Sequence, residues 1–443
     1  MKKKASSADF RYNTGAARIP WAAVGESVHE QDVLELVRFL LPPAPGSSRA
    51  YAAQFKRLAA DLGKLRRNSG TAGKLSLGES VKAVEQEASK VLKAKHAVFL
   101  TNATAGFEIA YKFAGLKPGD EVIAPAITFI ATIAYPLNIG ARVVLADIDP
   151  RTLNMDPKDV ARKITRRTKV IIPVHIGGYP ADMAPIMRLA RRHNIIVIED
   201  AAHAFGATYR GRMAGTIGHF GAFSFHEVKN ITSLGEGGLL VTDLPCGGDF
   251  GKARFLALDL SRKIRNWLYD VVALRGRGGP FAAGNHSATE LQALGLSLQM
   301  KRLKAIIAKR RRAAVYLTRR FAKVDGLMTP PADTAGTRGT HHLYLLRVDP
   351  DRAGGDVRTL KRKLAEKGVV NIPHFAPLYK FSVMKQLGYD TAAIERTCPN
   401  AEEVFNRQFT HLPLYDFAPA DLKYMADAVI AAVAEMKAEH RKC

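Results

Sequence analysis

Cysteine is scarce in this chain of 443 residues, which contains Cys246, Cys398 and Cys443 and no others. Their spacing offers neither a metal-binding pair nor a disulfide framework, so we predict no metal site. So low a count also suits a reducing cytoplasm. No apolar run approaches the roughly 20 residues needed to cross a bilayer. The basic residues 2–4 are not followed by an apolar signal core, so we expect a cytoplasmic protein with no membrane partner.

Acidic residues are too few to balance the basic ones, because 41 Asp and Glu stand against 66 Lys and Arg. The resulting net charge of +25 is compatible with nucleic acid, anionic lipid or an anionic small substrate as a partner. Residues 301–323 carry 10 Lys and Arg and no acid, with apolar residues at helical spacing. This segment is either the solvated face of a packed helix or a field that attracts phosphorylated ligands. The basic stretches have little aromatic interleaving, so we do not expect nucleic acid to be the partner.

From residue 80 onward, short apolar stretches alternate with segments of helical periodicity. We expect strands at 97–101, 121–124, 142–147, 169–174, 195–199, 220–225 and 238–242, and helices at 80–93, 104–114, 129–138 and 182–193. Short apolar strands joined by helices predict an α/β fold, in which a mostly parallel seven-stranded sheet has helices on both faces. Ligands in such sheets bind beyond the carboxyl ends of the strands.

We expect three parts along the chain. Residues 1–79 form an N-terminal segment, residues 80–295 a large α/β domain, and residues 296–443 a smaller α+β domain. Two helices are expected in the first part, at 28–40 and 50–66, with a Pro-rich break between them. In the third part we expect strands at 342–348 and 369–372, a linking helix near 289–323 and a final helix at 419–438. Residues 246–284 have no clear periodicity and predict a long excursion.

A lysine and an aspartate lie near the ends of two expected strands. Lys229 precedes the glycine-rich segment 235–238, and Asp200 ends an apolar strand. A lysine can form a Schiff base with pyridoxal phosphate (PLP), and a buried aspartate can hold the pyridine nitrogen protonated, so that the ring accepts electrons. A lone lysine is more often a surface residue near a strand end. The neighbouring glycines, Ser224 and the position of Asp200 favour the cofactor site.

Several ordered segments resemble one family. They are Asp200-Ala201-Ala202-His203-Ala204, Ser224-Phe225-His226-Glu227-Val228-Lys229, Thr128-Phe129-Ile130-Ala131-Thr132 and Asn285-His286-Ser287-Ala288-Thr289-Glu290-Leu291-Gln292-Ala293. Together they are similar to the PLP-dependent sugar aminotransferases of the DegT–StrS family, a branch of the fold-type-I aminotransferases. The resemblance covers roughly residues 75 to 440. An arginine often found two residues beyond the family's asparagine is Ser287 here, which puts the contacts at that point in doubt.

The resemblance implies a set of site residues. Lys229 would bind PLP and move a proton, and Asp200 would pair with the pyridine nitrogen. The phosphate would be bound by Ala103 and Thr104 at a helix start, by Ser224, and by Asn285 reaching from a neighbouring subunit. Phe129 would stack on the ring and His203 would lie beside its phenolic oxygen, while His374 would face the substrate. From the residues alone, the segment around Ala103 could be a plain helix cap, Phe129 a core residue and His374 a packing residue.

The resemblance also implies the reaction and the assembly. An amino acid, either glutamate or glutamine, would donate an amino group to a keto-sugar linked to a nucleotide, and the enzyme would be a homodimer with shared active sites. A keto-cyclitol or another non-nucleotide ketone is an alternative acceptor, and a regulator that binds nucleic acid through a degenerate enzyme fold is an alternative of another class. About 30 residues near 41–73 look like an insertion relative to the family. They would either help to bind the acceptor's phosphates or add packing at the dimer surface.

Overall fold

The computed structural model describes residues 28–70, 75–258, 271–370 and 375–441. The chain divides into two compact units, Met1–Glu79 and Ser80–Cys443. In the first unit, α1 (Glu30–Leu40) and α2 (Ser48–Arg67) confirm the two expected helices. The guanidinium of Arg38 lies 4.6 Å from the ring centroid of Phe55, which joins the two helices. No residue of α2 is buried, because the pair is too small to enclose a core.

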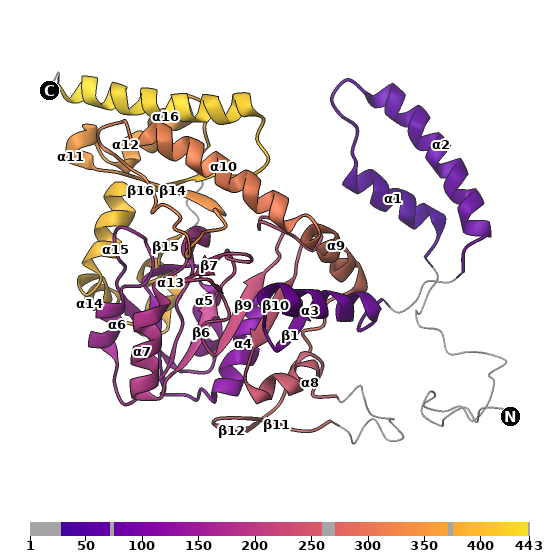
Figure 1. Cartoon of the computed structure of the whole chain (residues 1–443), viewed down its shortest axis with the longest axis horizontal. Coiled ribbons are helices and arrows are strands. Elements are labelled where there is room, and N and C mark those ends of the chain that lie inside the picture. Colours follow the sequence, from indigo (N-terminus) through magenta and orange to yellow (C-terminus); the bar gives the residue numbers. More distant parts are fainter. Residues whose placement is uncertain (1–27, 71–74, 259–270, 371–374, 442–443) are drawn as a thin grey trace. The chain divides into compact units, whose positions relative to one another are not determined.

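The second unit is built on a seven-stranded sheet, which lies at the centre of this unit in Figure 1, in colours from purple to rose. Its strands are β1 (His96–Leu100), β2 (Glu121–Pro125), β4 (Arg142–Ala146), β5 (Thr168–Ile171), β6 (Ile196–Asp200), β9 (Phe220–Ser224) and β10 (Gly238–Thr242). Their order is β1-β10-β9-β6-β5-β2-β4. The pairs from β9 to β4 are parallel, and β10 is antiparallel to both of its neighbours. The predicted fold class and its mostly parallel sheet are therefore confirmed.

Helices cover both faces of this sheet, because side chains alternate along each strand. Val98 and Leu100 point into a core that contains α4, whereas Phe99 between them points into a core that contains α3 and α9. Ile123 of β2 packs with α6 and α7 on that second side. The helices are α3 (Glu79–Leu92), α4 (Ala103–Ala114), α5 (Ala131–Asn138), α6 (Pro157–Lys163), α7 (Met183–His193) and α9 (Glu290–Met300).

The C-terminal part is a smaller α+β arrangement with a core of its own. Its antiparallel sheet is formed by β13 (Leu327–Met328), β14 (Leu343–Val348) and β16 (Phe409–Pro413). It packs with α10 (Leu303–Phe321), α12 (Val357–Glu366) and α16 (Pro419–His440), which lie together in Figure 1. The remaining helices are α11 (Pro350–Ala353), α13 (Ser382–Gln386), α14 (Thr391–Arg396) and α15 (Pro399–Glu403). The boundary expected at residue 295 stays a prediction.

Two expectations for this part are wrong. The helix expected near 289–323 is two helices, α9 and α10, because Arg302 leaves the helical backbone with φ −101° and ψ 0°. No glycine or proline marks that break in the sequence. Val369 and Val370 of the strand expected at 369–372 are not in a strand, and residues 371–372 lie outside the described residues. The strand that pairs with β14 is β16, whose threonine, histidine and proline hid it from an apolar pattern.

Shorter elements complete the second unit. The excursion at 246–284 holds α8 (Phe250–Arg254) and the hairpin of β11 (Leu274–Gly276) and β12 (Gly279–Phe281), and its residues 259–270 lie outside the described part. A second hairpin joins β7 (Thr208–Tyr209) to β8 (Arg212–Met213), and β3 (Ile127–Thr128) pairs with β15 (Ala376–Pro377). Single helical turns occur at Ile176–Gly178, Pro245–Asp249, Leu378–Lys380 and Val404–Gln408. Among the described residues, we find no helix with the length and apolar character to cross a bilayer.

Candidate active site

Asp200 is the last residue of β6 and lies at the carboxyl end of the parallel strands. Its side chain is buried, with 5% of the residue exposed. Oδ2 accepts a hydrogen bond of 2.7 Å from the hydroxyl of Thr132, and Oδ1 accepts one of 3.1 Å from the backbone amide of Ala202. Burial nevertheless raises the pKa of this carboxyl, against the effect of these donors and of the nearby Lys229. A cation placed against Asp200 would therefore favour its charged form.

A short chain of hydroxyl groups supports this carboxylate. The hydroxyl oxygens of Thr128 and Thr132 are 3.0 Å apart. Thr132 gives its proton to Asp200, so it accepts the proton of Thr128. The fully buried Tyr111 donates to the carbonyl of Thr132 at 2.9 Å and so holds the start of α5. Both threonines belong to the segment 128–132 that carries the family resemblance, but the sequence did not indicate their role.

The residue before Asp200 anchors the end of β6. Glu199 is fully buried on the opposite face of the strand, where its carboxylate accepts the backbone amides of Gly215, Ile217 and Gly218 at 2.8, 2.6 and 2.5 Å. It also lies 2.9 Å from Nε2 of His175. Nδ1 of His175 accepts the amide of Ala181, so the ring proton is on Nε2 and points to Glu199. This satisfied network fixes the backbone that presents Asp200.

Lys229 lies in the tight turn between β9 and β10. Backbone hydrogen bonds close the turn, from Phe225 to the carbonyl of Gly237 and from Lys229 to the carbonyl of His226, at 2.8 and 2.9 Å. Burial lowers the pKa of the Lys229 amine, while the carboxylates of Asp200 and Glu236 act in the opposite direction. The effect of the Asp200 carboxylate on this amine shows that the two groups lie near each other. A lysine with a lowered pKa is a better nucleophile near neutral pH.

The start of α4 lies against the start of β10. Asn102 caps the helix, since its side-chain oxygen accepts the amide of Ala105 at 2.9 Å. A Cβ atom on Gly238 would stand 2.1 Å from the carbonyl carbon of Asn102 and 2.6 Å from the amide nitrogen of Ala103. Gly238 is paired with Ser224 across the sheet. The structure thus brings the predicted phosphate residues Ala103, Thr104 and Ser224 to one edge of the sheet, where a helix start favours an anion.

His203 and Phe129 are the two residues predicted to contact the cofactor ring, and Phe129 is the more exposed of them. His203 lies in the turn after Asp200 and is stacked on His342, with ring centroids 4.6 Å apart and planes at 20°. Phe375 lies 5.5 Å from the same ring. Phe129 lies between β3 and α5, and 59% of it is exposed. An exposed aromatic residue beside Thr128 is available to a planar ligand or to another chain.

Of two further predicted residues, Asn285 lies beside the end of β1, and His374 falls outside the described part of the chain. Asn285 lies on an exposed stretch, where its side-chain oxygen accepts the amide of Ser287 at 3.1 Å. The backbone of Asn285 forms a β-bridge with that of Phe255. The loop that contains Asn285 lies beside the end of β1, because the amide of Thr101 donates to the carbonyl of His286. His374 lies outside the described residues. The roles assigned to both residues therefore stay predictions.

These residues fit pyridoxal phosphate. The buried carboxylate of Asp200 suits a protonated ring nitrogen, the Lys229 amine suits an aldehyde, and the cradle at Gly238 has backbone in place of a side chain. The residues that the structure describes contain no group of three or more His, Cys, Asp or Glu that could hold a metal ion. The carboxylate of Asp200 and the amine of Lys229 support the chemistry of an organic carbonyl cofactor.

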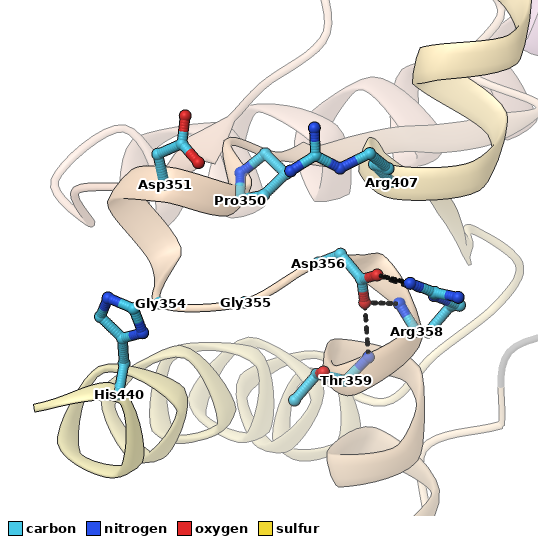
Figure 2. A pocket seen from close by; sticks show the side chains of 9 residues that line it. All are labelled: Pro350, Asp351, Gly354, Gly355, Asp356, Arg358, Thr359, Arg407 and His440. Atoms are coloured by element: carbon cyan, nitrogen blue, oxygen red, sulfur yellow. Dashed lines mark hydrogen bonds and ion pairs between the residues drawn. The ribbon is translucent and has the colours of Figure 1, made fainter. Parts of the chain in front are cut away.

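Figure 2 shows a different cavity, of about 590 Å³, in the C-terminal part. Three of its polar residues bind one another, because Asp356 accepts the amides of Arg358 and Thr359 at 2.9 and 3.2 Å and the Nε proton of Arg358 at 2.7 Å. The start of α12 is thereby capped from within the protein. Neither Asp200 nor Lys229 lines this cavity. It is therefore not a candidate for the active site.

Comparison with known proteins places this geometry in a family. A model of the DegT/DnrJ/EryC1/StrS aminotransferase family matches residues 60–430. The spore coat polysaccharide biosynthesis protein SpsC of Bacillus subtilis (strain 168) is 38% identical over 377 residues, which are 82% of this chain and 91% of SpsC. The GDP-perosamine synthase of Caulobacter vibrioides is 34% identical over 332 residues, 73% of this chain and 83% of that enzyme. Among solved structures, Spr1654 of Streptococcus pneumoniae in its PLP form aligns with a TM-score of 0.72 at 26% identity, covering 82% of this chain and 94% of Spr1654.

Proposed function

This chain belongs to the DegT/DnrJ/EryC1/StrS aminotransferase family, and we propose that it moves an amino group from glutamate or glutamine to a keto-sugar linked to a nucleoside diphosphate. The predicted family, enzyme class and cofactor are confirmed, since the protein is a PLP-dependent aminotransferase. The donor, the acceptor and the roles of individual residues belong to the proposal. So do the homodimer and the cytoplasmic location.

The observation that carries the proposal is that the buried carboxylate of Asp200, at the carboxyl end of the parallel strands, lies near the amine of Lys229. Both groups are desolvated, so the pKa of Asp200 is raised and that of Lys229 is lowered, and each acts on the other across the site. Neither pKa shift stabilises the protein without a ligand, because burying unmatched charges costs free energy. A ligand with a cationic ring nitrogen and an aldehyde satisfies both groups at once. Few other ligands combine these two properties.

Each residue then has a distinct task. Bound PLP supplies an electron sink for the bonds at the amino carbon of the substrate. Asp200 keeps the ring nitrogen protonated, and Thr132 keeps Asp200 oriented. Lys229 would hold the cofactor through its aldehyde carbon, and its freed amine would carry a proton at the reacting carbons. The start of α4 and Ser224 would bind the phosphate, Phe129 would stack on the ring, and His203 would lie beside its phenolic oxygen.

The choice of a nucleotide-linked acceptor rests on two supports. One relative has a name that refers to a GDP-linked sugar, the GDP-perosamine synthase. The chain also has a formal net charge of +25, which attracts a diphosphate to its surface. A regulator that binds nucleic acid is the weaker alternative: one relative, from Geobacillus stearothermophilus, is named a pleiotropic regulatory protein, but the family to which this chain belongs is described as one of aminotransferases.

A homodimer with shared sites has its support in the exposed residues near Asn285. The α9 residues Leu291, Leu294 and Leu298 recur at helical spacing and are 55%, 50% and 50% exposed. Apolar stripes of this kind are typical of protein interfaces. A second copy that covers α9 would bring the nearby Asn285 toward its neighbour, as the family resemblance implies. The three-part domain division, with boundaries at residues 79 and 295, is proposed on other grounds, because the two compact units divide after residue 79 and the C-terminal part has a core of its own.

Absorbance and trapping test this function. Purified protein with PLP should show a visible or near-ultraviolet band that glutamate bleaches, and borohydride reduction followed by peptide mapping should label Lys229. Lys229→Ala should abolish both signals, whereas Lys117→Ala, at an exposed lysine, should leave them unchanged. A panel of nucleotide-linked keto-sugars and keto-cyclitols then identifies the acceptor. Labelling of another lysine, or a band that survives in Lys229→Ala, would refute the assignment, and amination of only the cyclitols would replace the proposed acceptor.

A further inference from the structure

His342 connects three segments that surround the reaction centre. Its Nδ1 atom lies 3.0 Å from Oδ1 of Asn230, the residue that directly follows Lys229. Its ring is stacked on the ring of His203 at 4.6 Å. Its carbonyl accepts a hydrogen bond of 3.2 Å from Nη1 of Arg310 on α10. The lysine turn, the turn after Asp200 and α10 therefore all meet at this one side chain and its backbone.

Tight packing fixes the backbone on which His342 stands. Gly178 has φ +86°, and a Cβ atom there would lie 2.0 Å from the hydroxyl of Thr340 and 3.2 Å from the amide nitrogen of His342. The hydroxyl of Thr340 donates to the carbonyl of His203 at 2.6 Å. The segment 340–342 is therefore wedged between residue 178 and the turn after Asp200. A ring carried by this segment has little freedom to shift.

The bond between His342 and Asn230 has a defined direction. The amide oxygen of Asn230 can only accept, so Nδ1 of His342 carries the proton and donates it. The amide nitrogen of Asn230 is buried and has no hydrogen-bond partner among the described residues. The bond from His342 is thus the one hydrogen bond of the Asn230 side chain in the described part of the chain. Without it, the Asn230 side chain, next to Lys229, would lose this hydrogen bond to the C-terminal part.

We propose that His342 is a positioning residue for Lys229, which acts by donating its Nδ1 proton to Asn230 while its ring holds that of His203. This inference rests on the proposed function, because it assigns His342 a task in the chemistry of Lys229. His342 acts on Lys229 through Asn230, to which it is hydrogen-bonded, and through His203, on which its ring is stacked. A reaction that depends on a lysine aligned with a planar ring is sensitive to displacements of the lysine of about 1 Å.

Two substitutions separate the hydrogen bond from the ring. His342→Asn places an amide nitrogen near the position of Nδ1 and keeps the donor. His342→Phe keeps an aromatic ring against His203 and loses the donor. We expect His342→Phe to lower kcat about tenfold, in the range expected for one lost hydrogen bond and some misalignment. The KM for the amino donor should stay within about twofold, and His342→Asn should stay close to the wild type in both constants, because a positioning residue acts on the chemical step.

A spectroscopic readout is independent of turnover. In the holoenzyme, the absorbance of PLP bound to Lys229 changes with pH, and the midpoint reports the surroundings of the lysine nitrogen. His342→Phe should move this midpoint by at least about half a unit, whereas His342→Asn should leave it unchanged, because only the former loses the donor. Equal midpoints in the two variants would overturn the proposal, since the ring and not the donor would then be the part that matters.

A double-mutant cycle tests the bond itself. Asn230→Ala should reproduce the effect of His342→Phe, and the double variant should be no worse than the worse single variant, because both remove one interaction. Effects that multiply would overturn the proposal. Failure of the proposed function looks different, because the wild type would then show no PLP band or no amino transfer. If His342→Phe does not fold, Asn230→Ala and His342→Asn still decide the outcome.

Discussion

Removing the hydroxyl group that supports Asp200 should shift the pH dependence of the enzyme. Thr132→Val replaces that hydroxyl with a methyl group of similar size, so the volume of the site is kept and the 2.7 Å hydrogen bond to Oδ2 is lost. Asp200 is buried and its pKa is already raised. The lost donor stabilises only the charged carboxylate, so the substitution raises this pKa further.

The size of the shift follows from the kind of bond. A hydrogen bond to a charged group contributes about 1.5–3 kcal/mol. At 1.36 kcal/mol for each pKa unit, its loss corresponds to a rise of about 1–2 units. Activity requires ionised Asp200 and is lost as the pH falls through its pKa, so the acid limb of the kcat/KM profile should move to higher pH by this amount. Thr128 donates to the neutral Thr132 and not to the carboxylate, so Thr128→Val should give a smaller shift.

The assay is a pH profile of kcat/KM for the amino donor, measured together with the affinity for PLP. Thr132→Ser keeps the hydroxyl group and is the matched control, so its acid limb should stay near that of the wild type. A Thr132→Val profile that coincides with the Thr132→Ser profile would show that the hydroxyl does not support the carboxylate. A shift to lower pH would contradict the electrostatic reasoning itself.

Three further substitutions test other parts of the site. Glu236→Gln removes a carboxylate that raises the pKa of Lys229, so the rate of PLP attachment should reach its plateau at lower pH, and a move to higher pH would contradict this account. Gly238→Ala should weaken PLP binding at least about tenfold, because its Cβ atom would stand 2.1 Å from the backbone of Asn102. Gly248→Ala is its control, because a Cβ atom added there would have no atom within 4 Å apart from its chain neighbours. Equal PLP dissociation constants for the two variants would contradict a role of the backbone at Gly238 in binding PLP. Glu199→Gln should lower the free energy of unfolding by about 3 kcal/mol in a denaturant titration, because an amide nitrogen would face buried N–H donors. The exposed Glu395→Gln should cost less than about 0.5 kcal/mol, and a similar small loss at Glu199 would refute the role of its network.

Much of the fold was predictable because its signals are local. The strands of the central sheet are short apolar runs, and α4, α7 and α16 have regular apolar spacing, so their positions follow from the sequence to within a few residues. The failures came where local signals are weak. Arg302 breaks a helix with no glycine or proline nearby, and β16 is a strand because β14 pairs with it. The short β3 and β15 exist only as partners of each other, from segments about 250 residues apart.

By itself, the sequence determined the fold class and the family, and it indicated a lysine and an aspartate as the chemical pair, because these depend on periodicity and on ordered motifs along the chain. Tertiary structure alone decided which groups support that pair. The hydroxyl of Thr132 reaches Asp200 across 68 positions, and Nδ1 of His342 reaches Asn230 across 112. A hydrogen bond needs two atoms about 3 Å apart, and no local pattern of residues specifies such a distance between remote segments. Packing of Gly178 against Thr340 holds the segment that carries His342, and this packing exists only once the sheet and its helices have assembled.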